Sequence, residues 1–384
     1  MKAFAAAASA ALALSPCLYA EEPAETEVSV RGCFDISECG ENPDALEACR
    51  LNNFGCSADG KPVEILLESR PKDPDLPQLL TAMIAKWPSN LMSKFVKEAG
   101  EGKHDEDLRK GFFSVYEETD DSPAVLGQKY ALKDGRALLA LLFHFAPTDS
   151  FADETLGFYA YNPADGSLKP LQGYASDLRE NHMQTNCFPD VVSYELKPDS
   201  VAVYHECVDG SIFDLQQTYA FDGADFVFSE GTLAVPSDRK KLIESMNAIA
   251  PVYYGFYDID GDGFAELLLS NADHSKEMAI SPSSMADNSV IASHDEKSSF
   301  TFFKGAVATV SRDRAAFADT YVKLKDSVQA STLEMNKTDA GVTYAIDGKT
   351  ADAATGKAYV QSLEYIQPKI KWRRLSKVGK LGEE

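Results

Sequence analysis

The segment from Asp258 to Glu266 places acidic side chains at alternating positions. Asp258, Asp260 and Asp262 are each separated by one residue. Aspartates at this spacing can converge on one point while the chain turns, and Ca²⁺ prefers six to eight oxygen ligands of this kind. Gly263 follows at the position where a sharp turn requires a residue without a Cβ atom. The segment therefore predicts a calcium site whose ligands come from a single loop.

The first nine positions of this loop resemble the calcium loop of the EF-hand family. The twelfth position departs from that family, because it is Leu269 rather than a bidentate glutamate, and the run Leu267–Ser270 is typical of a strand. The loop is more similar to the Asp-x-Asp-x-Asp-Gly-x-x-acid loops of integrin-type FG-GAP repeats and related secreted bacterial proteins, which lead into a strand. This resemblance implies five calcium ligands: Asp258, Asp260, Asp262, the main-chain carbonyl of Phe264, and Glu266. FG-GAP arrays repeat the motif, whereas here it is single, so a propeller is not expected.

Two readings of the acidic loop compete with a structural calcium site. One is an acidic hairpin turn without metal, and the other is a catalytic metal. Three aspartates this close repel one another unless a cation shares them, which favours the metal. All the predicted ligands come from one loop without an adjacent base or nucleophile, so we expect the ion to stabilise the fold rather than to catalyse a reaction.

Known catalytic motifs offer no alternative site. Ser69 and Lys72 match Ser-x-x-Lys, but Pro71 breaks the helical spacing that would bring them together. Gly-x-Ser-x-Gly, His-Glu-x-x-His and phosphate-loop motifs are absent from the sequence. The histidines are dispersed, at positions 104, 144, 182, 205, 274 and 294. We therefore expect a binding or interaction protein with no identified catalytic residue, and the alternative is a cell-envelope hydrolase.

The N-terminus has the layout of a secretory signal peptide. Lys2 is followed by an apolar run from Ala3 to Leu14, which predicts cleavage after Ala20 and removal of residues 1–20. Alternatively, the residues before Cys17 resemble a lipobox, and the protein is a surface lipoprotein. The chain has no other apolar run of about 18 residues, so we expect a periplasmic or secreted protein without a transmembrane segment.

Six cysteines remain after this cleavage, and an even number in an exported chain predicts disulfide bonds. They are Cys33, Cys39, Cys49, Cys56, Cys187 and Cys207. The simplest arrangement has two bonds within the first four and one between the last two. The first four can pair in three ways, which the sequence does not distinguish. Their spacing lacks the Cys-x-x-Cys pairs of a zinc site.

The chain is strongly acidic, with a formal net charge of −23. Such an excess repels nucleic-acid phosphates and anionic membranes, so we expect neither as a partner. Calcium and an unidentified protein or glycan remain as ligands. Residues 369–380 are the exception, because they contain six basic residues. A solvated last strand and a docking site for an anionic glycan are both consistent with this run.

The overall pattern predicts an α+β protein built from an antiparallel, strand-rich meander with flanking helices. We divide it into a signal peptide (1–20), a Cys-rich segment (21–70), a helical pair with an antiparallel domain (71–235), and a C-terminal α+β domain that contains the calcium loop (236–384). Leucine spacing predicts two helices separated near Pro88. Asp-Gly pairs between apolar runs predict hairpin turns.

Strands are predicted at Val63–Leu67, Ala137–Phe145, Leu156–Tyr161, Val191–Leu196, Val201–Cys207, Leu215–Phe221 and Phe226–Phe228. After position 236 the sequence predicts a helix at Arg239–Ile249 capped by Pro236-Ser237-Asp238, strands at Leu267–Ser270 and Phe300–Val310, a helix at Arg314–Lys325, a hairpin of Leu333–Asn336 with Val342–Ile346, a helix near Lys357–Leu363 and a last strand from Ile370. The stretch that follows Ser270 is polar and rich in Ser and Asn.

Overall fold

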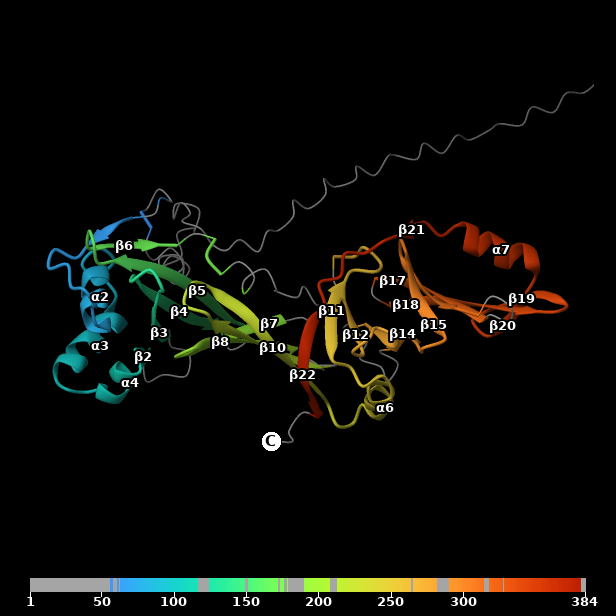
Figure 1. Cartoon of the computed structure of the whole chain (residues 1–384), viewed down its shortest axis with the longest axis horizontal. Helices are drawn as coiled ribbons and strands as arrows, with labels where there is room; N and C mark the ends of the chain where they lie inside the picture. Colours follow the sequence, from blue (N-terminus) through green and yellow to red (C-terminus); the bar gives the residue numbers. More distant parts are fainter. Residues whose placement is uncertain are drawn as a thin grey trace, which may run out of the picture.

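The computed structural model describes residues 56–57, 61, 63–116, 124–148, 151–171, 173–175, 178, 190–207, 213–263, 265–281, 290–313, 318–326 and 328–380. Strands dominate, helices are few, and the strands form three sheets of six, nine and seven strands within these residues. The molecule is elongated, with the six-stranded sheet at one end, the seven-stranded sheet at the other and the nine-stranded sheet between them (Figure 1).

Two short helices cover the outer face of the six-stranded sheet, as the leucine spacing predicts. Helix α2 (Leu76–Ile84) begins at Asp75, whose carboxylate accepts the N–H of the third helical residue. Helix α3 (Asn90–Gly100) begins at Ser89, which caps it in the same way. The predicted break near Pro88 is confirmed. A short helix, α4 (Asp105–Arg109), follows.

The six-stranded sheet is an antiparallel meander. Its strands, in spatial order, are β1 (Ile65–Leu66), β6 (Ser167–Pro170), β5 (Phe151–Asn162), β4 (Ala137–Thr148), β3 (Ala124–Ala131) and β2 (Phe112–Tyr116). Gly135 and Gly166 lie in Asp-Gly turns at φ angles of 87° and 78°, as the hairpin prediction requires. One face packs on α2 and α3 and the other on the nine-stranded sheet.

The nine-stranded sheet joins residues from before and after position 236. Its strands, in spatial order, are β14 (Val290–His294), β13 (Glu277–Ile280), β12 (Glu266–Ser270), β11 (Tyr253–Tyr257), β22 (Arg373–Lys380), β10 (Phe226–Val235), β9 (Asp214–Phe221), β8 (Ser200–Cys207) and β7 (Asp190–Lys197). Strand β22 inserts parallel to β10 and antiparallel to β11. The sheet thus continues across the predicted domain boundary, and the division at position 236 stays a prediction.

Opposite faces of the nine-stranded sheet pack on different partners near the acidic loop. Leu267 and Leu269 of β12 face helix α6 (Lys240–Ile249). Leu268, between them, faces the seven-stranded sheet. Because side chains alternate along a strand, β12 is buried on both faces, and its three central residues are all leucine.

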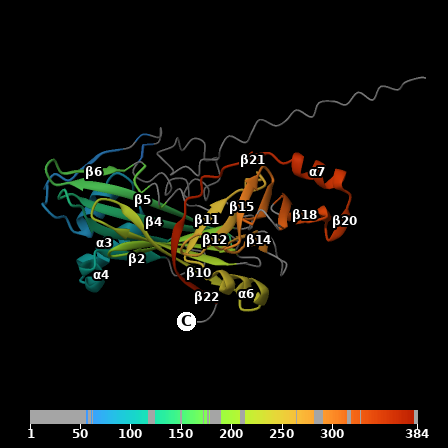
Figure 2. The same cartoon turned by 45° about the vertical axis from the view of Figure 1, so that its right-hand side comes forward.

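The seven-stranded sheet is antiparallel and carries helix α7 on its outer face. Its strands, in spatial order, are β20 (Lys349–Ala351), β19 (Gly341–Ile346), β18 (Val328–Thr338), β17 (Ala318–Lys325), β16 (Ala306–Ser311), β15 (Ser298–Phe303) and β21 (Tyr365–Ile366). Helix α7 (Ala353–Gln361) packs on Tyr321, Leu333 and Tyr344. It lies at the end of the molecule away from α2–α4 in both views (Figures 1 and 2).

Some sequence predictions for the C-terminal part are wrong. The predicted helix at Arg314–Lys325 is strand β17 where it is described, because Val322 and Leu324 face one core and Tyr321 the other. The predicted single strand Phe300–Val310 is the hairpin β15–β16, which turns at Gly305 with φ 73°. The polar stretch after Ser270 contains strands β13 and β14, which the sequence pattern did not indicate.

The helix predicted at Arg239–Ile249 is confirmed as α6, but its cap is not. The N-cap residue is Arg239, whose side chain makes no capping hydrogen bond. Within the described residues, no helix is long and apolar enough to cross a membrane.

The predicted signal peptide and Cys33, Cys39, Cys49 and Cys187 lie outside the described residues, so cleavage and disulfide pairing stay predictions.

Candidate metal centre

The acidic loop connects strands β11 and β12, which form an antiparallel hairpin. The pairing ends at Tyr257 opposite Glu266, so the residues between them form the loop. Asp258 therefore directly follows β11, and Glu266 begins β12. Both ends of the loop are held by a paired sheet, which limits the positions that the aspartates can take.

The three aspartates converge as the sequence predicts. One carboxylate oxygen from each of Asp258, Asp260 and Asp262 lies within 4.8 Å of the others, and all three residues are half-buried. Two ligand oxygens that each lie 2.3–2.6 Å from the same Ca²⁺ are separated by at most about twice that distance. The spacing of the three aspartate oxygens falls within this limit, so one cation can be shared by all three. The pKa of Tyr257 is raised by burial and, next, by the negative charge of Asp258.

Hydrogen bonds within the loop hold the carboxylates of Asp258 and Asp260. The two oxygens of Asp258 accept the N–H groups of Gly261 and Gly263 at 2.7 and 3.0 Å. Asp260 Oδ1 accepts the N–H of Asp262 at 3.1 Å. Each carboxylate oxygen has a second lone pair, so these bonds leave room for a metal.

The glycines are required by backbone conformation. Gly261 and Gly263 have φ angles of 78° and 91°, which side chains of L-residues rarely adopt. No atom lies within 4 Å of where a Cβ would stand at either residue, so conformation rather than crowding excludes other residues.

The middle of the loop is anchored to the seven-stranded sheet. Ile259 is 2 % exposed and packs in the core between the two sheets, beside Leu268. Its carbonyl accepts the N–H of Gly305, at the turn of the β15–β16 hairpin, at 3.0 Å. The acidic loop is therefore both packed on the seven-stranded sheet and hydrogen-bonded to it. The conformation of the loop is linked to this interface.

The two other predicted ligands differ from the aspartates. Phe264 lies outside the described residues, so its carbonyl stays a prediction. Glu266 is fully buried, and its Oε2 accepts the N–H of Ile259 at 2.6 Å. The converging group consists of the three aspartates, whereas Glu266 supports the loop through its bond to the loop backbone. Its role as a ligand also stays a prediction.

Two of the dispersed histidines meet at one carboxylate, which the sequence did not indicate. Glu277 Oε2 lies 3.1 Å from Nε2 of His294, and Glu277 Oε1 lies 3.3 Å from Nδ1 of His274. The Ser270 hydroxyl lies 2.8 Å from the same Nδ1 and donates to Glu277 Oε1 at 3.3 Å. Serine, histidine and glutamate therefore form one cluster.

Strand register explains this cluster. Ser270 on β12 is opposite Glu277 on β13, which is opposite His294 on β14. Opposite residues of antiparallel neighbours project from the same face of the sheet. A polar residue at the corresponding end of three neighbouring strands could have indicated this cluster from the sequence. That signal could be used only if strands β13 and β14 were predicted.

The cluster does not have the geometry of a nucleophilic triad. In a Ser-His-acid triad, the serine and the acid bind opposite nitrogens of the imidazole ring. Here Ser270 and Glu277 both contact Nδ1 of His274. Ser270 is also fully buried. A proton cannot pass through the ring from this serine to this carboxylate.

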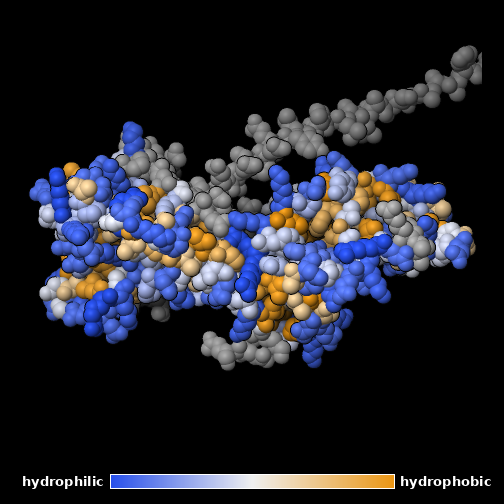
Figure 3. Space-filling view, viewed as in Figure 1, coloured by the Kyte–Doolittle hydropathy of each residue, from blue (hydrophilic) through white to orange (hydrophobic). Residues whose placement is uncertain are grey.

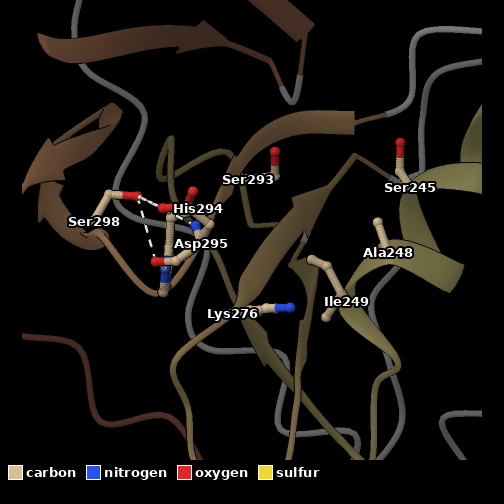
Figure 4. A pocket seen from close by; sticks show the side chains of 8 residues that line it. All are labelled: Ser245, Ala248, Ile249, Lys276, Ser293, His294, Asp295 and Ser298. Carbon is tan, nitrogen blue, oxygen red and sulfur yellow. Dashed lines mark hydrogen bonds between the residues drawn. The ribbon is translucent and has the colours of Figure 1, made fainter.

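A pocket of about 460 Å³ lies beside the cluster, between α6 and the ends of β13 and β14 (Figure 4). It is lined by Ser245, Ala248, Ile249, Lys276, Ser293, His294, Asp295 and Ser298. Both ring nitrogens of His294 are engaged, Nε2 by Glu277 and Nδ1 by the carbonyl of Asp295 at 3.1 Å. Lys276 is paired with Glu296 at 3.6 Å. These contacts hold the pocket wall together and do not direct a histidine towards a ligand.

Comparison with models of known protein families finds no match, and comparison with curated proteins finds none either.

Proposed function

We propose that this is an exported, disulfide-stabilised protein that binds calcium in the Asp258–Glu266 loop and acts by binding a partner rather than by catalysis. The observation that carries the calcium site is the convergence of Asp258, Asp260 and Asp262 within 4.8 Å. Loop hydrogen bonds that pre-form the carboxylate positions support it, because a rigid site loses less entropy when it binds an ion.

The proposed role of calcium is to hold two sheets together. The loop that carries the aspartates also carries Ile259, which packs on the seven-stranded sheet and bonds to Gly305. A cation that fixes the aspartates therefore restrains this contact. Ligand binding to the folded state alone raises stability by mass action.

The export and disulfide parts of the proposal rest mainly on sequence. The signal-peptide pattern and the even number of cysteines after cleavage support them. Of the cysteines in the Cys-rich segment, only Cys56 lies within the described residues, so the pairing proposed there rests on the number of cysteines. Cys207 lies opposite Asp190 in the β7–β8 pair, and Cys187 precedes Asp190 by three residues, which is compatible with a bond across this hairpin.

Thermal unfolding in calcium and in chelator tests the proposal. With calcium at about 100 times its Kd, binding adds about 2.7 kcal/mol, so for a chain of 384 residues we expect the chelator to lower Tm by roughly 3–4 °C. Asp260→Ala is expected to abolish this difference. Equal melting curves of the native protein in calcium and chelator contradict the proposed site.

Asp273→Ala is the matched control. Asp273 also lies in a turn, and its Oδ1 accepts the N–H two residues ahead at 3.2 Å, as Asp260 does at 3.1 Å. It lies outside the converging group. This variant is expected to keep the full calcium response, so a lost response there would point to a general effect of removing turn aspartates.

A further inference from the structure

The end of the chain carries a basic segment on an otherwise acidic protein. Between residues 365 and 382 there are six basic residues and no acidic one, whereas the whole chain has a net charge of −23. We call residues 369–380 the basic segment. Four of its cations are exposed: Lys369, Lys371, Arg374 and Lys377.

The fold presents the basic segment on a rigid support. Strand β22 is an inner strand, bonded to β10 on one side and to β11 on the other. Arg373 is buried, with its guanidinium 4.7 Å from the ring centre of Phe228. Arg374, the next residue, projects from the opposite face, where its register partner is Tyr253.

Several cations of the segment are not paired with the protein's own acids. Among the described residues, no salt bridge involves Lys369, Arg374 or Lys377. A strongly hydrophilic band lies over β22 at the middle of the molecule, between apolar patches (Figure 3). An anionic ligand can therefore approach these cations without displacing an internal partner.

Aromatic rings lie next to the cations. His274 stacks on Tyr253 with ring centres 5.3 Å apart and an interplanar angle of 9°, and its ring centre lies 5.0 Å from that of Trp372. The His274 side chain is 42 % exposed, and the other two residues are half-buried. We call these three residues the ring cluster. Flat rings beside fixed charges offer both stacking and ion pairing to a sugar chain that carries anions.

Two acidic residues lie close to the ring cluster. Glu277 Oε1 lies 3.3 Å from Nδ1 of His274 and Glu277 Oε2 lies 3.1 Å from Nε2 of His294, so this carboxylate is engaged by two histidines. Asp273 precedes His274 in the turn, and its carboxylate accepts both the N–H and the hydroxyl of Ser275. Those bonds hold the Asp273 carboxylate within its own turn.

We propose that the basic segment and the ring cluster bind a linear glycan that carries carboxylate or sulfate groups. The inference rests on the binding role proposed above and names the class of ligand. A thin polymer can follow the basic segment alone, whereas a flat anionic membrane also faces the acidic remainder of the surface and is repelled. The rings can stack on the flat faces of the sugars, and a polyanion without sugar rings cannot make this contact.

Titration of the full-length protein with hyaluronate fragments, against uncharged chitin fragments of equal length, tests this proposal. We expect hyaluronate to bind at least about tenfold more tightly than the uncharged chain, with affinity that falls as salt rises. Arg374→Glu with Lys377→Glu is expected to weaken binding at least about tenfold, because attraction becomes repulsion. His274→Asn, which tolerates the left-handed backbone at φ 56°, is expected to weaken binding by a smaller factor.

The control is Lys323→Glu with Lys325→Glu, which makes the same charge change on two exposed lysines of β17. It is expected to alter hyaluronate binding by less than about twofold. Equal affinity for the charged and uncharged chains overturns the proposal, and so does unchanged binding in the Arg374–Lys377 variant. Preferential binding to anionic phospholipid vesicles or to single-stranded nucleic acid also overturns it. Each titration is run in calcium and in chelator. Glycan binding without a calcium response in the melts would contradict the calcium site alone, and the reverse result would contradict the glycan site alone.

Discussion

The carboxylate of Glu266 accepts the backbone N–H of Ile259 at 2.6 Å, so the first residue of strand β12 supports the middle of the loop that precedes it. Both residues are buried, and Ile259 also packs on the neighbouring sheet. This hydrogen bond connects the acidic loop to the nine-stranded sheet. Ile259 in turn connects the same loop to the seven-stranded sheet. Glu266 has this structural role whether or not it also reaches a cation.

We predict that Glu266→Ala destabilises the fold even in chelator. Loss of the acceptor leaves the buried N–H of Ile259 unsatisfied, which costs about 1–3 kcal/mol. Glu266→Gln keeps an acceptor and should cost less. Urea unfolding in chelator measures both variants, with Glu230→Ala on the exposed face of β10 as a control expected within about 0.5 kcal/mol of the native protein. If Glu266→Ala unfolds like the control, the proposed support of the loop is wrong.

Gly263→Ala is predicted to weaken calcium binding by about tenfold, which corresponds to about 1.4 kcal/mol. The left-handed φ of 91° is unfavourable for alanine, so the variant must strain or rearrange the loop that carries the aspartates. Gly102→Ala is the control, because Gly102 also has a positive φ, of 80°, and open space around it. Calorimetric titration should show unchanged calcium affinity for Gly102→Ala, and equal losses in the two variants would argue against a specific site.

Ile259→Ala tests the link between the loop and the seven-stranded sheet. Removal of this buried side chain is expected to cost about 2–4 kcal/mol and to reduce the stabilisation that calcium adds. Val328→Ala, at a residue 55 % exposed on β18, should change neither quantity appreciably. Denaturant unfolding with and without calcium separates the two effects. An unchanged calcium increment in Ile259→Ala would show that the loop and the interface are independent.

Asp319 provides a prediction about pH. Its carboxyl is buried, and burial raises its pKa, although Ser311 donates its N–H at 3.0 Å. The folded state therefore prefers the neutral acid, and this contribution to stability is lost as pH rises through the folded pKa. Asp319→Asn keeps an acceptor for Ser311 and removes the buried charge. We expect a higher Tm than the native protein at pH 7 and no difference below about pH 4.

Asp352 gives the opposite sign and serves as the comparison. The N–H and hydroxyl of Thr355 lower its pKa, so its contribution is present at neutral pH and lost as pH falls through the folded pKa. Asp352→Asn should lower Tm at pH 7 and not in strong acid. Parallel pH profiles for Asp319→Asn and Asp352→Asn would contradict both assignments.

The elements that were predicted correctly depend on local signals. Asp75 and Ser89 cap helices whose leucines repeat at helical spacing, and Asp-Gly turns separate the strands of the first sheet. Such patterns follow from the preferences of a few neighbouring residues. The loop aspartates belong to the same class, because a short segment contains the whole converging group.

The misassigned elements depend on distant partners. Strand β17 is buried against two different cores, so its apolar residues do not alternate and the sequence is compatible with a helix. The β15–β16 hairpin turns at Lys304-Gly305, which lacks the aspartate that marked the other turns. In both cases the deciding information lies in neighbouring strands.

The sequence by itself determined the acidic loop, the strand-rich antiparallel character and the location of the basic segment, because each is encoded by adjacent residues. Only the tertiary structure placed β22 between β10 and β11, brought Arg374 opposite Tyr253, and joined Glu277 to two histidines. Pairing between strands far apart in the chain depends on the packing of whole sheets, and the free energy of that packing is not contained in any short segment.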